Sequence, residues 1–289
     1  MNYTQLKQLI QDYTQNYETT FVNDIPTFVE QAEQRIYNTI QFPSLRKNVT
    51  GSITVNNQYL SCPSDFLATY SLAVYTTAST TATGTSGTLI ITVTSNSGIA
   101  IGQQASGTGI AANSYVINIS GTSITLSVPN TGTVSGTVTF QGPYQYLLNK
   151  DVNFIREAYS YPTSYGTPKY YALFGPTVTS GTVTNYLSFM LGPNPDTTYN
   201  AELHYYYYPL SISDTTNNPS GTSWLGNNFD TVLLYGSLVE AYTFMKGEAD
   251  MVALYEKRYT EALALAKRLG DGMERTDAYR SGQYRQAVT

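Results

Sequence analysis

The sequence predicts an α+β fold: a helical bundle formed by the N- and C-terminal helices, an antiparallel β region, and an inserted all-β module. Three observations support this. Apolar residues recur at steps of three and four near both ends of the chain, and alternation with period two begins near Thr50. Between Asp65 and Lys150 there is no Asp, Glu, Lys, Arg or His, which marks an insert of different composition. A chain of 289 residues is long enough to bury a substantial core.

Two helices are expected at the N-terminus. Between Tyr3 and Tyr17 the apolar residues form one helical stripe. Asp24 is placed as the N-cap of a second helix, with Pro26 in its first turn, where a missing N–H costs little. That helix is expected to run to about Ile40.

A short β segment follows the helices. Strands around Ile53 and Tyr59 are predicted to form a hairpin, with its turn at Asn56-Asn57. The next strand is expected over Leu72 to Tyr75. Further strands over Tyr186 to Leu191 and Ala201 to Tyr208 flank a loop rich in Pro and Gly, and they are expected to pair as a second hairpin.

The uncharged segment 76–140 is dominated by Thr, Ser and Gly. Such composition often stays unfolded, but aliphatic residues alternate within it, which favours strands. We expect an Ig-like sandwich or a small barrel, with one hairpin turn at Ser120-Gly121. The alternating residues are Leu89, Ile91 and Val93; Ile117 and Ile119; Ile124, Leu126 and Val128; and Val134, Val138 and Phe140.

Two helices are expected near the C-terminus. The first has Asp230 as its N-cap and is interrupted at Lys246-Gly247, and the second begins at about Asp250. Gly270 stands where the residue after a helix C-cap is expected. The predicted division is therefore a main domain over 1–75 and 141–270, the insert 76–140, and a C-terminal arm over 271–289.

The segment 271–289 has no apolar stripe and cannot bury its own surface. A frayed terminus is the common fate of such a segment, but Tyr and Arg are enriched at binding hot spots, so we favour an assembly arm. The candidate contact residues, toward another protein or a neighbouring copy of this chain, are Arg275, Tyr279, Arg280, Tyr284 and Arg285.

Charge and composition exclude several classes of protein. The net charge of −5 argues against gripping nucleic acid through its phosphates, which requires a basic face. Only 12% of residues are charged while 27 are Tyr, so much of the surface is expected to be uncharged and Tyr-rich, which suits lasting protein contacts. Cys62 is the only cysteine, and no apolar run approaches a membrane span.

A catalytic centre is not expected. His204 is the only histidine and lies within a predicted strand, so a Ser-His-Asp triad has one possible base. One Cys and one His exclude the usual zinc spacings. Asp151 and Glu157 could form a glycosidase pair, although cap and turn roles are the better explanation, as they are for Asp65 and Asp196. No cofactor or metal is expected.

Several short strings, in this order and spacing, resemble the head-to-tail adaptor (connector) proteins of tailed bacteriophages. The resemblance covers nearly the whole chain except the insert. The strings are Pro63-Ser64-Asp65-Phe66, Gly166-Thr167-Pro168-Lys169-Tyr170-Tyr171, Leu191-Gly192-Pro193 with Pro195-Asp196, the Tyr205 to Pro209 run, Asn228 to Gly236 continuing to Ala241-Tyr242 and Lys246-Gly247-Glu248, and Asp277-Ala278-Tyr279-Arg280.

The resemblance implies a structural, non-enzymatic virion protein at the head-tail junction, made in the host cytoplasm. It implies a ring, commonly a dodecamer, that binds the portal protein and the tail nozzle or tail tube protein. DNA would pass through the ring without specific binding, and no membrane is involved.

Two other functions remain open from the sequence. The chain could be a receptor- or carbohydrate-binding tail protein that acts through the insert, whose aromatic side chains are mainly Tyr115 and Phe140. It could also be a tail-associated hydrolase that uses Asp151 or Glu157, although the sparse carboxylates disfavour this.

Overall fold

The structure is a computed structural model that describes residues 1–40, 42, 45–175, 177–179, 182–185 and 187–274. In these residues the chain is α+β, as predicted, with six helices and several antiparallel sheets. It divides into two compact units. One comprises residues 1–47 and the chain from Tyr206 on, and the other comprises Asn48–Tyr205. We refer to them as the helical unit and the β unit.

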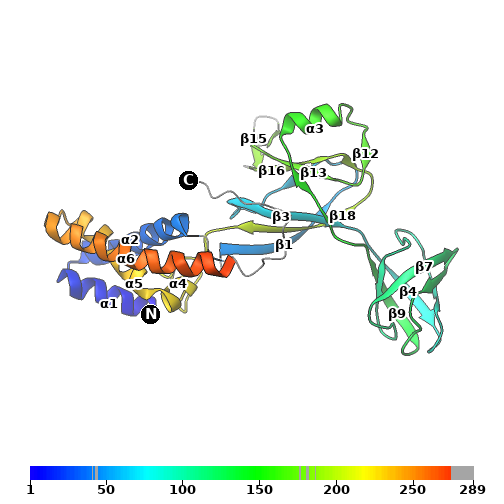
Figure 1. Cartoon of the computed structure of the whole chain (residues 1–289), viewed down its shortest axis with the longest axis horizontal. Coiled ribbons are helices and arrows are strands. Elements are labelled where there is room, and N and C mark those ends of the chain that lie inside the picture. The colour runs from blue at the N-terminus through cyan, green and yellow to red at the C-terminus, as the bar shows by residue number, and fades with distance from the viewer. Residues whose placement is uncertain (41, 43–44, 176, 180–181, 186, 275–289) are drawn as a thin grey trace. The chain divides into compact units, whose positions relative to one another are not determined.

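The elements are labelled in Figure 1. The helices are α1 (Tyr3–Thr14), α2 (Thr19–Thr39), α3 (Val152–Ala158), α4 (Trp224–Asn228), α5 (Asp230–Phe244) and α6 (Ala249–Glu274). The strands are β1 (Arg46–Ile53), β2 (Tyr59–Ser61), β3 (Ala68–Tyr75), β4 (Thr77–Gly84), β5 (Ile90–Val93), β6 (Gln104–Ser106), β7 (Ser114–Ser120), β8 (Ser123–Leu126), β9 (Val134–Gln141), β10 (Gln145–Tyr146), β11 (Leu148–Asn149), β12 (Tyr165–Gly166), β13 (Tyr170–Phe174), β14 (Thr177–Thr179), β15 (Thr182–Asn185), β16 (Ser188–Gly192), β17 (Asn194–Pro195) and β18 (Tyr199–Tyr206).

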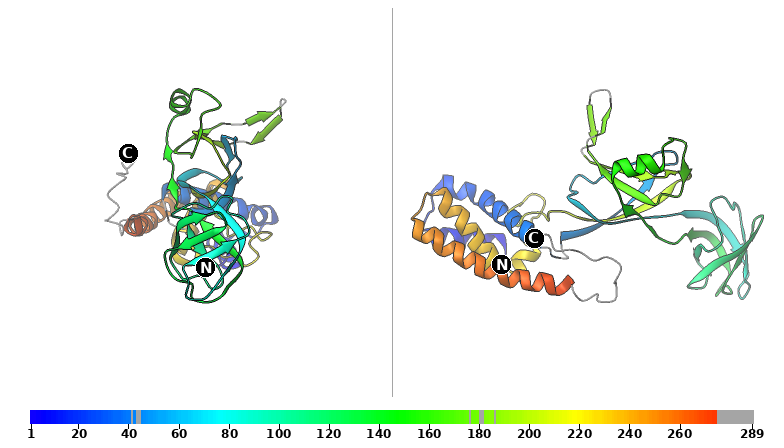
Figure 2. Two further views of the ribbon diagram at one scale, coloured as in Figure 1. Left: turned by 90° about the vertical axis from the view of Figure 1, so that its right-hand side faces the viewer. Right: turned by 45° about the horizontal axis from the view of Figure 1, so that its top comes forward.

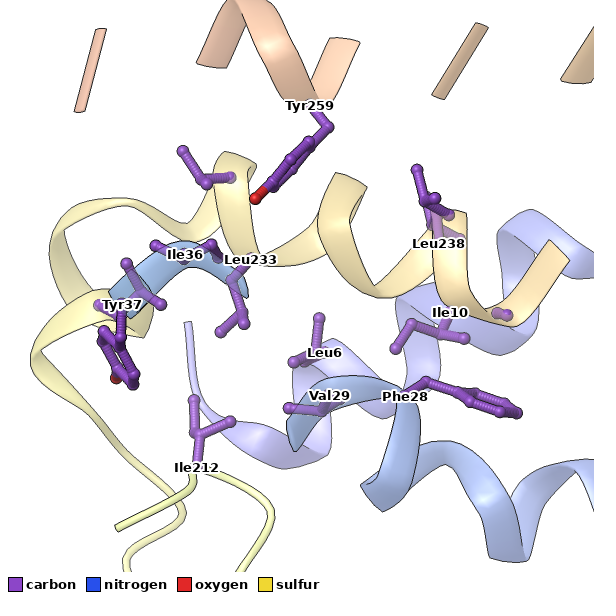
Figure 3. Close-up of a cluster of buried hydrophobic side chains, with 14 of the residues drawn as sticks. Leu6, Ile10, Phe28, Val29, Ile36, Tyr37, Ile212, Leu233, Leu238 and Tyr259 are labelled. Atoms are coloured by element: carbon purple, nitrogen blue, oxygen red, sulfur yellow. The ribbon is translucent and has the colours of Figure 1, made fainter. Parts of the chain in front are cut away.

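In the helical unit, α1, α2, α5 and α6 share one apolar core (Figure 3). Helix α5 packs against the other three, which explains why residues all around it, from Val232 to Ala241, are buried. Gly236 permits this approach, because a Cβ there would stand only 3.2 Å from both Ala32 Cβ and Tyr259 Cε2. Burial of these apolar faces, rather than helix propensity, stabilises the unit.

The N-terminal helices begin and end at other residues than predicted. Helix α1 ends at Thr14 instead of Tyr17, because Gln15 takes the left-handed conformation. Helix α2 begins at Thr19, so Asp24 is not its N-cap and Pro26 lies inside the helix. The missing N–H of an interior Pro costs about 3 kcal/mol. Starting the helix early buries Phe21 completely in the core, and this burial offsets most of that cost.

The C-terminal helices are confirmed, with changes at two positions. Phe229 is the N-cap of α5, and Asp230 is its first residue. The predicted break at Lys246-Gly247 is present, with Lys246 at a φ of 53° and Gly247 N–H donating to the Tyr242 carbonyl. Gly270 does not end α6, which continues to Glu274, because Gly lowers helix stability by only about 1 kcal/mol and does not forbid the conformation. Helix α4 was not predicted.

The two predicted hairpins of the β unit are wrong. Strands β1 and β2 lie in different sheets, ordered β1-β18-β3-β10 and β11-β13-β16-β2. The turn between them exists, with Asn57 N–H donating to the Thr54 carbonyl. However, only Asn56 has a positive φ, whereas the tight two-residue hairpin requires it at both central residues.

Strands β16 and β18 also belong to different sheets. The loop between them does not simply reverse the chain, because it contains β17, which pairs in parallel with β12. Asn194 N–H donates to the Ser164 carbonyl there. Tyr186, the predicted start of the first strand, lies outside the described residues. Burial alternates along β18, since Leu203 and Tyr205 are buried and their neighbours are partly exposed.

The insert forms a closed barrel of six strands in the order β4-β5-β8-β7-β6-β9 (Figure 2). Of the two predicted architectures, the small barrel is therefore the one found. The turn at Ser120-Gly121 joins β7 to β8, with Gly121 at a φ of 59°. Most of the predicted inward residues form the barrel core: Ile91, Val93, Ile124, Leu126, Val134, Val138 and Phe140.

Strand β7 departs from the predicted alternation. Val116 is buried and Ile117 is exposed, because a β-bulge between Val116 and Asn118 places an extra residue in the strand. Ile119 then returns to the edge of the core. The two residues just outside the strands, Leu89 and Val128, are also exposed rather than inward.

Candidate assembly surfaces

Arg35 of α2 makes polar and ring contacts with α6 in the helical unit. Its guanidinium forms two hydrogen bonds with the Glu256 carboxylate and lies 4.6 Å from the centre of the Tyr259 ring. The hydrogen bond to Glu256 raises the pKa of Arg35. Glu240 of α5 adds a longer ion pair at 3.9 Å. The contact is partly exposed, and burial of Tyr255, Tyr259 and Ala266 in the core orients α6.

The outward face of α6 carries apolar side chains. Leu254, Leu265 and Leu269 are all exposed, and Leu265 is 66% exposed. Steps of eleven and four residues place them along one side of a helix. We call these three residues the α6 leucine stripe. The neighbouring side of α6 is buried through Tyr255, Tyr259 and Ala266, so the stripe is not required for the core of this unit.

Exposed tyrosines occur in both units, as the composition predicts. In the β unit, the ring of Tyr144 packs against that of Tyr75 with centroids 4.7 Å apart, and nearby Tyr146 is largely exposed. Such rings provide contact area at low entropic cost. The exposed tyrosines among the described residues are Tyr13, Tyr17, Tyr70, Tyr115, Tyr144, Tyr146, Tyr161, Tyr165 and Tyr208.

A buried carboxyl group was missed by the sequence analysis. Glu33 of α2 is 2% exposed, and its carboxylate accepts a hydrogen bond from the Ile212 amide. Burial raises the pKa of Glu33 to about 7. The signal was present in the spacing, because Glu33 follows Val29 by four residues and precedes Ile36 by three, on the buried face of the helix.

His204 has polar neighbours on the sheet, but their geometry is not that of a triad. Its Nδ1 lies 3.3 Å from Ser71 Oγ, and its Nε2 lies 3.6 Å from Glu202 Oε1. A base and its orienting carboxylate are normally within about 2.6–3.2 Å. Glu202 instead accepts a hydrogen bond of 2.6 Å from Asn48 Nδ2. The group is best described as polar pairing between adjacent strands.

The candidate carboxylates have structural partners. Asp151 caps α3 by accepting a hydrogen bond from the Asn153 amide, as expected of a cap. Asp65 accepts one from the Tyr205 hydroxyl at 2.8 Å, and Asp196 accepts one from the Tyr199 hydroxyl at 2.7 Å. Glu157 is exposed on α3. Among the described residues, no group of three or more His, Cys, Asp or Glu could hold a metal ion.

The predicted contact residues of the C-terminal arm, Arg275, Tyr279, Arg280, Tyr284 and Arg285, lie outside the described residues. Of the two aromatics considered for a sugar site in the insert, Phe140 is completely buried in the barrel core and Tyr115 is exposed. A stacking platform in the insert would therefore depend on Tyr115. In the described part of the chain, no helix has the length and apolar character needed to cross a membrane.

Two stretches, residues 1–151 and 143–286, match a family model described as the SU10 adaptor protein. The chain belongs to this family of phage adaptor proteins. The resemblance seen in its short strings is thereby confirmed, and the chain is a structural adaptor of the bacteriophage virion. A comparison with curated proteins gives no match. The first stretch includes residues 76–140, so the match to the family model does not exclude the insert.

Proposed function

We propose that the chain forms a ring, a dodecamer, that joins the portal protein to the tail nozzle or tail tube and continues the DNA channel. The observation that carries this proposal is the family match, which extends over both halves of the chain. Assembly takes place in the host cytoplasm, and the ring then resides at the head-tail junction of the virion.

The α6 leucine stripe supports contact between subunits. Leu254, Leu265 and Leu269 form an exposed apolar face on a helix whose neighbouring side packs in the core. Contacts between two different faces of identical subunits close into a ring when the rotation permits. In this proposal the stripe of one subunit packs against a different face of the next.

The C-terminal arm adds the contact with the portal or with the neighbouring subunit. In this proposal the adaptor domain comprises residues 1–75 and 141–270, the insert comprises 76–140, and the arm comprises 271–289. The arm would act through Arg275, Tyr279, Arg280, Tyr284 and Arg285, because Tyr and Arg give high binding energy per residue.

DNA passes through this ring without being held. The chain has 15 Lys and Arg against 20 Asp and Glu, so a ring of copies carries a large negative charge. Acidic side chains along the bore would repel phosphates, and DNA would slide without sticking.

Measurement of the oligomeric mass of the full chain, with and without portal protein, tests the ring. We expect a multimer of one defined size, alone or on the portal. The double variant Leu265→Glu, Leu269→Glu should remain monomeric, whereas the double variant Ala253→Glu, Ala264→Glu, which adds the same charge at exposed positions on another side of α6, should assemble normally. A wild-type chain that stays monomeric under both conditions would contradict the proposal.

A further inference from the structure

The outer surface of the barrel carries exposed apolar side chains on β5 and β7 and just outside the ends of β5 and β8. Ile90 and Asn118 both lie opposite Thr125 of β8, and Ile117 precedes Asn118 as the extra residue of the bulge. Further along the barrel, Leu89 and Tyr115 lie on either side of the end of β8. The Leu89 carbonyl accepts a hydrogen bond from Leu126 N–H, and Tyr115 exchanges hydrogen bonds with Ser127.

These side chains are exposed at the barrel surface. Leu89, Ile90, Tyr115, Ile117 and Val128 are 40%, 51%, 43%, 51% and 37% exposed, whereas Ile91 and Val116 on the same strands are buried. We call these five residues the barrel patch. The bulge places the Ile117 side chain outward, where a polar residue would be expected on a solvated strand. The patch therefore has the character of a contact surface.

The charge of the barrel limits what can cover the patch. No residue from Phe66 to Asn149 is Asp, Glu, Lys, Arg or His, so the whole barrel surface lacks ionisable charge. A charged protein, a phosphate or a nucleic acid would lose solvation on this surface without gaining a counter-charge. An uncharged surface with Ser, Thr and apolar side chains avoids that loss, and the barrel of another copy is such a surface.

The closed topology defines the kind of contact. Strand β4 pairs with both β5 and β9, and β6 pairs with both β7 and β9, so this barrel does not offer a free edge for strand addition. The partner must pack through side chains. Five partly exposed side chains present less than the roughly 800 Å² that each partner gives to a stable interface. Such a contact forms only where copies are already held together.

We propose that the barrel patch packs against the uncharged barrel of a neighbouring copy of this chain in the assembled ring. This inference rests on the ring of the proposed function and extends it, because it assigns a role in ring assembly to the insert. Identical uncharged barrels meet without like-charge repulsion, so the contact should not weaken as salt is lowered.

Site-specific photocrosslinking of the full chain tests this contact. The variant Ile117→Cys is labelled at pH 7 with a thiol-reactive benzophenone. The native Cys62 should remain largely unlabelled, because burial raises its pKa to about 12 and leaves little thiolate. Irradiation of the assembled ring should link the label to residues 76–140 of another copy, as located by mass spectrometry. Ile90→Cys is the second test site.

The matched control is Ser97→Cys, in an exposed loop of the same barrel. This loop lies beside the β7–β8 turn, where Asn96 donates to the Gly121 carbonyl, away from Leu89 and Tyr115. We expect at least a fivefold lower yield of linked copies from the control. Equal yields from Ile117→Cys, Ile90→Cys and Ser97→Cys in an intact ring, or links mainly to the portal, would overturn the barrel contact while leaving the ring in place. A chain that remains monomeric with portal present would overturn both.

Discussion

The carboxylate of Glu33 accepts a hydrogen bond of 3.1 Å from the Ile212 amide inside the core of the helical unit. The Ser211 hydroxyl adds a second hydrogen bond, but burial is the largest influence and raises the pKa of Glu33 to about 7. The charged form is therefore disfavoured in the folded chain. Exposed Glu30, on the same helix, adds repulsion in the same direction.

Stability of the helical unit should fall as pH rises because of Glu33. Its pKa is near 4.5 in the unfolded chain and about 7 when folded, so the neutral form is favoured by folding. The contribution is fully present below about pH 4.5 and is lost as pH rises through 7, a loss on the order of 3 kcal/mol. Denaturant unfolding at pH 5 and pH 8 measures it.

Glu33→Gln should remove this pH dependence. The amide oxygen still accepts from Ile212, so stability at pH 5 should be close to that of the wild type, while at pH 8 the variant should be more stable. Glu30→Gln, on the exposed side of α2, is the control and should retain most of the wild-type slope. Equal slopes for the wild type and Glu33→Gln would show that the carboxyl group is not buried as described.

Local signals in the sequence were sufficient for most of the individual elements. The break at Lys246-Gly247 was visible because Gly removes the Cβ constraint at a helix end, and alternation identified the barrel strands. The exception at Ile117 arises from a bulge, which changes the alternation without a clear mark in composition. The fold class followed from these local patterns.

Strand pairing could not be read from the same signals. Neighbouring strands in the sequence were assumed to pair, but β1 pairs with β18 and β2 with β16, more than a hundred residues away. Partner choice depends on burial of whole sheet faces, which no short window contains. Of the candidate contact surfaces, the C-terminal arm was proposed from composition. The α6 leucine stripe could be identified only from the structure, which shows which side of α6 faces the core.

Gly236→Val should destabilise the helical unit by about 1–3 kcal/mol. The added side chain would meet Ala32 and Tyr259, and helices α2 and α6 would have to move away from α5. Thermal unfolding of the full chain measures the loss. Gly51→Val is the control, since nothing lies within 4 Å of a Cβ at that position. Similar melting temperatures for both variants would contradict the close packing around α5.

Tyr205→Phe should destabilise the β unit by about 1–2 kcal/mol. The ring is retained, but Asp65 loses the hydrogen bond that it accepts at 2.8 Å, and hydrogen bonds to charged groups contribute more than neutral ones. Denaturant unfolding followed by near-ultraviolet circular dichroism reports the change. Tyr146→Phe, at a largely exposed ring, should have little effect, and a loss as large as that of Tyr205→Phe would argue against a specific role for the buried hydroxyl.

Truncation after Glu274 should separate folding from portal docking. The cut leaves α6 whole, so the melting temperature of the remaining chain should stay within a few degrees of the wild type. Binding to purified portal should fall at least tenfold, because the arm's Tyr and Arg side chains are lost. A full-length variant with Ala at Arg275, Tyr279, Arg280, Tyr284 and Arg285 distinguishes side-chain contacts from chain length, and should match the truncation. Undiminished portal binding by the truncated chain, measured by electron microscopy of the complex, would show that the arm does not contribute to docking. The α6 leucine stripe would then be the main candidate surface.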